Sequence, residues 1–436
     1  MCGRACALRS RGSFGNMEPI LLGIREGWGQ EAPFGLPYLD RRQHFYTVGK
    51  SGTGKTTLLR NMIVQDIEAG CGVGVIDPHG DLATEILDYI PRHRIEDVVY
   101  FNPADLEYPI GLNLLEHVPP DERHLVASGI VSVFRSIWSE FWGPRLEYIL
   151  YATIAALLDC ENVSLLGVQR MLSDKRYRAW VVKQVKDPQV KSFWVNEFEN
   201  YDDRFLREAV APIQNKVGQL LMSPHLRNIL GQVRSRIDAR FMMDNGRIFI
   251  ADLSKGKLGA DKSNLLGALL VTQFQLAAMS RADIREEDRR DFFLYVDEFQ
   301  SFTSDSFAAV LSEARKYRLC LILSHQYIDQ LRPEIRNAVL GNVGSIMAFR
   351  VGHADAKLFE DVFGATYTAS QLNSLSNYEV CAKLLINGED HEPFLGKTLA
   401  ALGKRYGRRG IIVRRTREKY SMRRKVVEGK IRKWVF

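Results

Sequence analysis

Residues Val48 to Thr57 read VGKSGTGKTT and contain the pattern G-x-x-x-x-G-K-[ST]. Glycines in this pattern let the backbone wrap a phosphate with its N–H groups pointing inward. An apolar segment, His44–Val48, precedes the loop, and an amphipathic helical segment follows it as far as Gly70. Such a helix presents the positive end of its dipole to a bound phosphate. The sequence therefore predicts a strand, a phosphate-binding loop and a helix.

Two side chains of this loop are expected to act on a nucleotide. Lys55 is predicted to reach the β and γ oxygens, and Thr56 to hold Mg²⁺. The alternative is a glycine turn without a ligand, but the flanking strand and helix favour an ATP site. The predicted nucleotide-binding residues are Gly49, Lys50, Ser51, Gly52, Thr53, Gly54, Lys55, Thr56 and Thr57.

A second apolar segment, FFLYVDE, ends in the carboxylates Asp297 and Glu298. The carboxyl ends of parallel strands form the ligand edge of a sheet. There Asp297 is predicted to accept hydrogen bonds from the water shell of Mg²⁺, and Glu298 to polarise the attacking water. A solvated strand end would give the same pair, but the phosphate loop favours a role in ATP hydrolysis.

Three more polar residues are candidates for the site. Gln326 ends the apolar segment LCLILSHQ and is predicted to sense the γ-phosphate or the water, unless it only caps a helix or lies on the surface. Arg315 and Arg350 each lie near a strand that is expected to line the same sheet edge. Either is a candidate arginine finger or an ordinary salt-bridge partner.

The rest of the chain alternates short apolar strands with helices, apart from one region. Strands are expected at 72–77, 247–253, 292–298, 319–326 and 345–351. Near-continuous apolar strands separated by helices predict an α/β fold whose parallel-rich sheet is covered by helices on both faces. Residues 120–231 carry long amphipathic helical patterns and predict an inserted all-α domain. The predicted division is 1–17, 18–119, 120–231, 232–400 and a tail at 401–436.

The formal charge of +7 is concentrated in the tail. Residues 403–436 hold fourteen Lys and Arg against two Glu, a balance of +12, so the body carries −5. With Tyr406, Tyr420 and Trp434 interleaved, the tail could neutralise phosphates of DNA while its aromatics stack on bases. The alternatives are a disordered, solvated tail and a contact with anionic lipid.

Other features bear on the cellular compartment. The six cysteines are scattered without CxxC pairs, which favours a reducing interior over a disulfide framework. The longest apolar run noted, Tyr148–Leu158, is about half of the roughly 20 residues that span a bilayer. Met17 is a candidate start, and the first sixteen residues lack the apolar block of a secretory signal. A cytoplasmic protein is expected, with at most peripheral contact with the inner face of the cell membrane.

The chain resembles the HerA-FtsK superfamily of hexameric DNA-pumping ATPases. The resemblance covers about residues 18–399 and lies in GKSGTGKTTLLRNMI, GVIDPHGDL, FLYVDEFQSF, SEARKYRLCLILSHQ and NVGSIMAFRVGHADAKLFE. Within that superfamily DPHGD, PIGLNLL (Pro109–Leu115) and the all-α insertion are most similar to the TraG/TraD-like coupling proteins of conjugative and type IV secretion systems.

The resemblance implies a RecA-like motor domain that assembles as a hexameric ring around DNA. It matches Lys55 and Thr56 to the Walker A pair, Asp297 and Glu298 to the Walker B pair, and Gln326 to the sensor. Arg315 and Arg350 become candidate fingers that act on a neighbour's nucleotide. The chain differs from coupling proteins in showing no transmembrane helices before the motor, and from HerA in showing no obvious N-terminal β-barrel.

Three functions fit these patterns. The first is a DNA-translocating ATPase in conjugative transfer or type IV secretion. The second is an ATP-gated adaptor, in which the all-α domain recruits relaxase or effector proteins. The third is a cytosolic HerA-like helicase in DNA repair or phage defence. Relaxase or secretion-channel proteins are also candidate partners of the protein in general.

Overall fold

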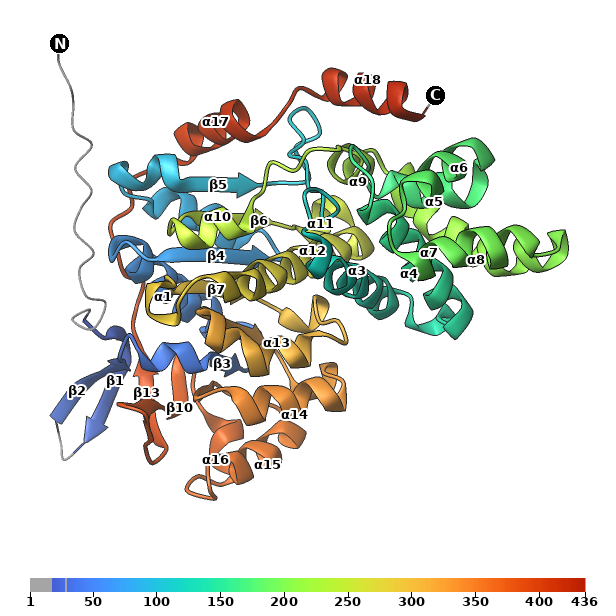
Figure 1. Cartoon of the computed structure of the whole chain (residues 1–436). Coiled ribbons are helices and arrows are strands. Elements are labelled where there is room, and N and C mark those ends of the chain that lie inside the picture. The colour runs from blue at the N-terminus through green and yellow to red at the C-terminus, as the bar shows by residue number, and fades with distance from the viewer. Residues whose placement is uncertain (1–17, 28–29, 436) are drawn as a thin grey trace, which may run out of the picture.

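The computed structural model describes residues 18–27 and 30–435. The expectation for the segment 1–17 falls outside the described residues. The described chain forms an α/β fold around one long sheet (Figure 1). The predicted fold class, a RecA-like parallel-rich sheet covered by helices, is confirmed.

Eleven strands form this sheet, in the order β2-β1-β13-β10-β9-β3-β8-β7-β4-β6-β5. Pairing is parallel from β9 to β5 and antiparallel from β2 to β9. The parallel strands are β3 (Phe45–Val48), β4 (Gly72–Asp77), β5 (Val98–Phe101), β6 (Ile248–Asp252), β7 (Phe292–Val296), β8 (Leu319–His325) and β9 (Ser345–Ala348). The antiparallel extension comprises β1 (Ile20–Gly27), β2 (Gln30–Leu36), β10 (Glu379–Lys383) and β13 (Phe394–Thr398), and β11 (Leu385–Ile386) pairs with β12 (Glu389–Asp390).

The parallel strands are apolar throughout because both faces of the sheet are covered. In β7, Phe292 and Leu294 join the hydrophobic cluster on one face, whereas Phe293 and Tyr295 join the cluster on the other. All of these side chains are fully buried. The pleat therefore divides each strand between two cores, and the acidic residues and the histidine of the parallel strands lie only where these strands end.

Helices from different parts of the chain cover the two faces of the sheet. The helix α1 (Lys55–Glu68) and the short α2 (Asp81–Ile86) cover one face. The other face is covered by α10 (Ala239–Asp244), α12 (Ala260–Met279), α13 (Phe307–Glu313), α14 (Pro333–Asn342), α15 (His353–Val362) and α16 (Ala369–Ser374). The short α11 (Lys255–Leu258) lies against α12.

The segment between β5 and β6 is helical, as expected for residues 120–231. It contains α3 (Arg123–Ile137), α4 (Pro144–Leu158), α5 (Leu166–Ser173), α6 (Lys175–Gln184), α7 (Pro188–Ser192), α8 (Asp203–Met222) and α9 (Pro224–Leu230). Its buried side chains form one continuous cluster with the sheet face that α12 covers. The division of the chain into domains stays a prediction.

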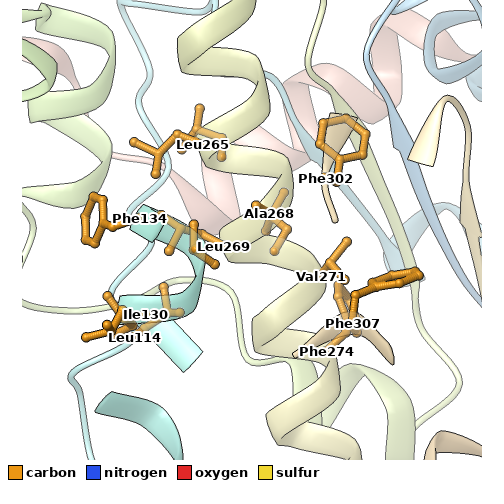
Figure 2. Close-up of a cluster of buried hydrophobic side chains, with 14 of the residues drawn as sticks. Leu114, Ile130, Phe134, Leu265, Ala268, Leu269, Val271, Phe274, Phe302 and Phe307 are labelled. Atoms are coloured by element: carbon orange, nitrogen blue, oxygen red, sulfur yellow. The ribbon is translucent and has the colours of Figure 1, made fainter. Parts of the chain in front are cut away.

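The helix α12 links this helical layer to the sheet. Figure 2 shows Ile130 and Phe134 of α3 on one flank of α12, and Phe302 and Phe307 on the other. By length and composition Ala260–Asp283 is the one helix among the described residues that could cross a membrane, and 61% of its apolar window is buried inside the fold. The apolar surface of this helix is thus used in the core.

The basic tail is folded onto the body. It forms α17 (Arg409–Tyr420), which lies beside the edge strand β5, and α18 (Arg424–Val435), which lies beside α9 (Figure 1). Ile412 and Val427 are fully buried. The hydroxyl of Thr416 accepts a hydrogen bond from the backbone N–H of Tyr100 in β5, at 3.2 Å. The alternative of a disordered, solvated tail is therefore wrong.

Candidate nucleotide-binding and catalytic site

The phosphate-binding loop lies between the ends of two strands that flank β3. The N–H of Gly49 donates to the carbonyl of His325 at the end of β8 (3.3 Å), and the N–H of Lys50 donates to the carbonyl of Arg350 beyond β9 (2.9 Å). A Cβ at Gly49 would lie 2.6 Å from Cβ of Phe349. Glycine is therefore required there by close packing, and the loop is fixed from both sides.

The helix α1 begins directly behind the loop. Its N-cap is Gly54, whose φ of 121° suits glycine and few other residues. Lys55 starts the helix, and its Nζ donates to the carbonyl oxygens of Gly49 and Lys50, the latter at 3.1 Å. Burial lowers the pKa of Lys55, and the charges of Glu298 and Asp297 act in the opposite direction. The ammonium is thus folded over the loop, where phosphate oxygens would take the place of these carbonyls.

Thr56 and Asp297 are the two residues predicted to hold Mg²⁺. Thr56 is exposed in the first turn of α1. Asp297 follows β7 and is only 6% exposed. Burial raises the pKa of Asp297 to about 6, and the nearby charges of Asp77 and Glu298 add to this effect. A hydroxyl and a buried carboxylate are a suitable donor set for Mg²⁺, which prefers oxygen. When bound, the ion would neutralise charge on the phosphates.

Both carboxylate oxygens of Glu298 are hydrogen-bonded. Gln326 Nε2 donates to one oxygen at 3.0 Å, and Gln300 Nε2 donates to the other at 2.6 Å. Glu298 has φ 47° and ψ 48°, a left-handed conformation that non-glycine residues rarely adopt. Backbone strain of this kind concentrates at functional sites. The structure thus brings together the predicted base and sensor, and adds Gln300, which sequence reasoning missed although it lies two residues from Glu298.

The two candidate arginines lie at opposite ends of the parallel strands. Arg350 lies at the carboxyl ends, with the phosphate-binding loop, and Arg315 lies at the amino ends. Arg350 lies beside the phosphate-binding loop, and its guanidinium donates to the Leu375 carbonyl (3.3 Å) and to Oδ1 of Asn377 (3.1 Å). Arg315 is exposed on the short helix η12 (Ala314–Tyr317), just before β8 begins. It lines a cavity of about 540 Å³ with Arg42 and Gln43, which precede β3.

The position of Arg315 corrects the expectation that both arginines share the nucleotide edge. The loop follows the carboxyl end of β3, whereas Arg315 precedes the amino end of β8, which is parallel to β3. The seven residues of β8 separate Arg315 from Gln326. At about 3.3 Å per residue, this strand puts Arg315 on the order of 20 Å from the nucleotide edge of its own chain.

A row of carboxylates continues along the nucleotide edge. Asp77 ends β4 and lies in register with Asp252, which ends β6. Asp77 accepts from the N–H groups of His79 (2.8 Å) and Ala83 (2.9 Å), which holds the turn of the DPHGD segment. The DPHGD segment was part of the family resemblance, but the second carboxylate, Asp252, was not predicted from the sequence. Adjacent strands that end in acidic residues are the signal that could have found the row.

The basic tail completes the surface beyond this row. A cavity of about 1040 Å³ lies between α17, the 102–110 segment and Lys257, which follows β6. It is lined by more cations than carboxylates. Its charged lining residues are Lys257, Arg409, Arg414, Arg417 and Arg423 against Asp105 and Glu418. Arg417 also donates to Asp105 at 2.8 Å and lies over the ring of Tyr108.

The sequence matches no protein-family model and no curated protein. Among solved structures, the plasmid coupling protein TrwB in complex with the ATP analogue ADPNP superposes with a TM-score of 0.63 at 16% identity, over 90% of this chain and 98% of that chain. The chain has the fold of TrwB. TrwB with ADP and Mg²⁺ gives a TM-score of 0.62 at 16% identity, over 90% of this chain and 98% of that chain.

VirB4 of Thermoanaerobacter pseudethanolicus has a similar structure, with a TM-score of 0.57 and 15% identity, over 88% of this chain and 96% of that chain. The superpositions with TrwB and with VirB4 each cover most of both chains, so the likeness includes the helical layer as well as the sheet. The likeness is one of fold, and the chemistry rests on the residues of the site.

Proposed function

We propose that this protein is an ATP-hydrolysing motor that binds and translocates DNA as a hexameric ring, in conjugative transfer or type IV secretion. The observation that carries the proposal is the constellation at Glu298. A carboxylate held by Gln326 and Gln300 lies on the strand edge that also presents Lys55 and Asp297.

Each part of this constellation has a chemical task in the proposed reaction. The loop N–H groups and Lys55 bind the phosphates, and Thr56 and Asp297 hold Mg²⁺ with the nucleotide. Glu298 accepts a proton from the attacking water, and the two amides fix the orientation of its carboxylate. Gln326, which follows β8, then senses whether the γ-phosphate has been hydrolysed and passes this difference to the strand. The complexes of TrwB with ADP and Mg²⁺ and with ADPNP support the binding of a nucleotide and Mg²⁺, and the roles of the single residues rest on the geometry of the site.

The positions of the arginines support a ring. Arg315 is exposed at the edge of the sheet opposite to its own nucleotide. A guanidinium there is placed to serve the site of an adjacent subunit, where an arginine supplied by another chain accelerates hydrolysis by about 10³ to 10⁵ in measured cases. Arg350 instead lies beside the phosphate-binding loop of its own chain, so we assign the trans role to Arg315.

The charge distribution supports DNA as the partner. Phosphate contacts from Lys and Arg supply most of the sequence-independent affinity for DNA. The five cationic side chains around the cavity beside α17 provide such contacts next to the nucleotide edge of the sheet. We therefore propose that DNA passes this surface, which couples hydrolysis to movement.

The cellular setting follows from the same features. The described cysteines Cys71, Cys160, Cys320 and Cys381 are free and buried, which fits a reducing compartment. ATP as the fuel fits the same compartment. We propose work in the cytoplasm at the inner face of the cell membrane, with relaxase or secretion-channel proteins as partners.

The test is steady-state ATP hydrolysis by the purified protein, with and without single- and double-stranded DNA. We expect DNA to raise the rate severalfold, and the variant Lys55→Ala to lose both the basal and the stimulated rate. A rate that depends on Lys55 but is indifferent to both forms of DNA would favour an ATP-gated adaptor. The helical layer would then be the surface to search for its client protein.

A further inference from the structure

An exposed tyrosine lies against the phosphate-binding loop. The N–H of Tyr378 donates to the carbonyl of Thr53 at 2.7 Å. A Cβ at Gly54 would lie 2.8 Å from Cδ1 and 3.3 Å from Cε1 of the tyrosine ring. The ring is nevertheless 43% exposed. One part of the aromatic surface therefore packs on the loop, while another part is open to solvent beside it.

The backbone of Tyr378 is held in an unfavourable conformation. Its φ is 67°, in the left-handed region that tyrosine rarely adopts. Its carbonyl accepts hydrogen bonds from the N–H (2.8 Å) and the hydroxyl (3.3 Å) of Thr398. Arg350 fixes the preceding residues through the Leu375 carbonyl and Asn377. An exposed aromatic ring on strained backbone adds little to the core, so the structure maintains it for another reason.

The topology shows which end of a nucleotide this ring would meet. In the order β10-β9-β3-β8-β7, the hydrolytic residues follow β8 and β7, on one side of the loop. Tyr378 directly precedes β10 and contacts the loop from the β9 side. A triphosphate whose γ-phosphate faces Glu298 must extend its nucleoside away from that flank. The nucleoside therefore leaves the loop toward Tyr378.

We propose that Tyr378 is the stacking platform for the nucleobase. The proposal rests on the proposed ATP binding and adds the subsite for the base. An aromatic platform binds any base through its π-face and discriminates weakly between them. Among the described residues, no buried hydrogen-bonding group is found in contact with the ring, so nothing there would distinguish one base from another. The subsite therefore accepts purine nucleoside triphosphates of either kind, ATP and GTP.

The experiment distinguishes the contribution of the base to binding from that of the phosphates. Dissociation constants of ATP, GTP and inorganic tripolyphosphate are measured with Mg²⁺ by calorimetry, for the wild-type protein, Tyr378→Phe and Tyr378→Asn. Asparagine removes the ring but tolerates the left-handed backbone. We expect Tyr378→Asn to weaken ATP and GTP about tenfold or more and tripolyphosphate less than twofold. Tyr378→Phe should bind all three within about twofold of the wild type.

A second exposed tyrosine provides the matched control. Tyr148 is 49% exposed on α4 in the helical layer, and Tyr148→Ala should leave all three affinities unchanged. Unchanged ATP binding by Tyr378→Asn would overturn the stacking proposal. An equal loss of ATP and tripolyphosphate would overturn it too, because the ring would then support the loop rather than the base. If the wild-type protein binds neither ATP nor tripolyphosphate, the proposed function itself fails.

Discussion

Gln326 Nε2 lies 3.0 Å from Oε1 of Glu298, so the end of β8 is hydrogen-bonded to the carboxylate that follows β7. The two strands are paired in parallel, and this side-chain contact joins their carboxyl ends. If Glu298 is protonated or changes its hydrogen-bond partner, the hydrogen bond from Gln326 at the end of β8 changes directly. The first prediction concerns these two residues.

Glu298→Gln should lower kcat by about 10² to 10⁴, because the general base is lost while the shape of the site remains. ATP binding should stay within a few-fold of the wild type, since Lys55 and the loop are intact. Gln326→Ala should lower kcat more than it raises KM, because it releases one oxygen of the base. Steady-state kinetics and nucleotide binding check both. A Glu298→Gln variant with normal kcat would remove Glu298 from the reaction.

Asp297→Asn should stabilise the nucleotide-free protein while it abolishes hydrolysis. Burial, with the charges of Asp77 and Glu298, raises the pKa of Asp297 to about 6, so the carboxylate is mostly ionised at pH 7.5 and its buried charge lowers the stability of the fold. Asparagine removes that charge and can keep the hydrogen bond from the N–H of Glu298 (3.1 Å). In EDTA at pH 7.5 we expect the free energy of unfolding to rise by about 1–3 kcal/mol. A loss of stability would contradict this explanation.

Hydrolysis across a subunit interface can be tested by mixing two inactive variants. Arg315→Ala should lower kcat by about 10³ or more if the arginine acts on a neighbour. In a mixture of Arg315→Ala and Glu298→Gln, some sites combine an intact Glu298 with an intact Arg315 from the adjacent subunit. These sites should recover measurable ATP hydrolysis. No recovery, in a mixture shown to form mixed oligomers, would exclude the trans role.

The buried His44 should make the folded state sensitive to acid. Its Nε2 lies 3.1 Å from the Leu311 carbonyl, and its Nδ1 accepts from the N–H of Leu321 at 3.1 Å, an arrangement that suits the neutral ring. Burial lowers the pKa of His44 to about 4. The folded pKa lies below the unfolded value of about 6.5, so this contribution to stability is full above pH 6.5 and falls toward pH 4.

Urea unfolding at several pH values measures this effect. Between pH 7.5 and pH 5 we expect a loss of about 2 kcal/mol from His44. His44→Gln should unfold more easily at pH 7.5 but show a smaller loss between the two pH values. An equal pH dependence in the variant would assign the acid sensitivity to other groups, among them the buried His325, whose pKa burial lowers to about 3.

Gly267 of α12 links the core to the catalytic segment. A Cβ at this position would lie 2.2 Å from the ring of Phe302, which follows the turn after Glu298. Gly267→Ala should therefore cost about 1–3 kcal/mol through overpacking and also lower kcat. Gly341→Ala in α14 is the matched control, because its Cβ would meet nothing within 4 Å. If the Gly267 variant is as stable as that control, the packing argument fails.

The sequence predicted the central strands and the phosphate loop because their signals are local. The loop needs fixed residue types at fixed spacing, and strands buried on both faces are almost continuously apolar. Glu298 and Gln326 could be placed at one edge because each follows such a strand. The hairpin of β1 and β2 was not expected, since this outer strand pair has a partly exposed, mixed sequence.

Features that depend on distant contacts could not be predicted in the same way. Arg315 is near Gln326 in sequence, but a whole strand runs between them and puts them at opposite edges. Tyr378 reaches the loop from more than three hundred residues away. The tail buries only a few apolar residues, among them Ile412 and Val427, and the rest of its sequence is strongly basic. Its packing on the body could therefore not be predicted from the sequence.

The most direct measurement is the ATP-driven displacement of a third strand from triplex DNA, which only a protein that moves along the duplex produces. The wild-type protein should release the third strand in an ATP-dependent manner, with a delay that grows with the length of duplex between entry site and triplex. Glu298→Gln should bind the same DNA and release nothing. ATP hydrolysis without any displacement by the wild-type protein would contradict the proposal that this chain translocates along duplex DNA.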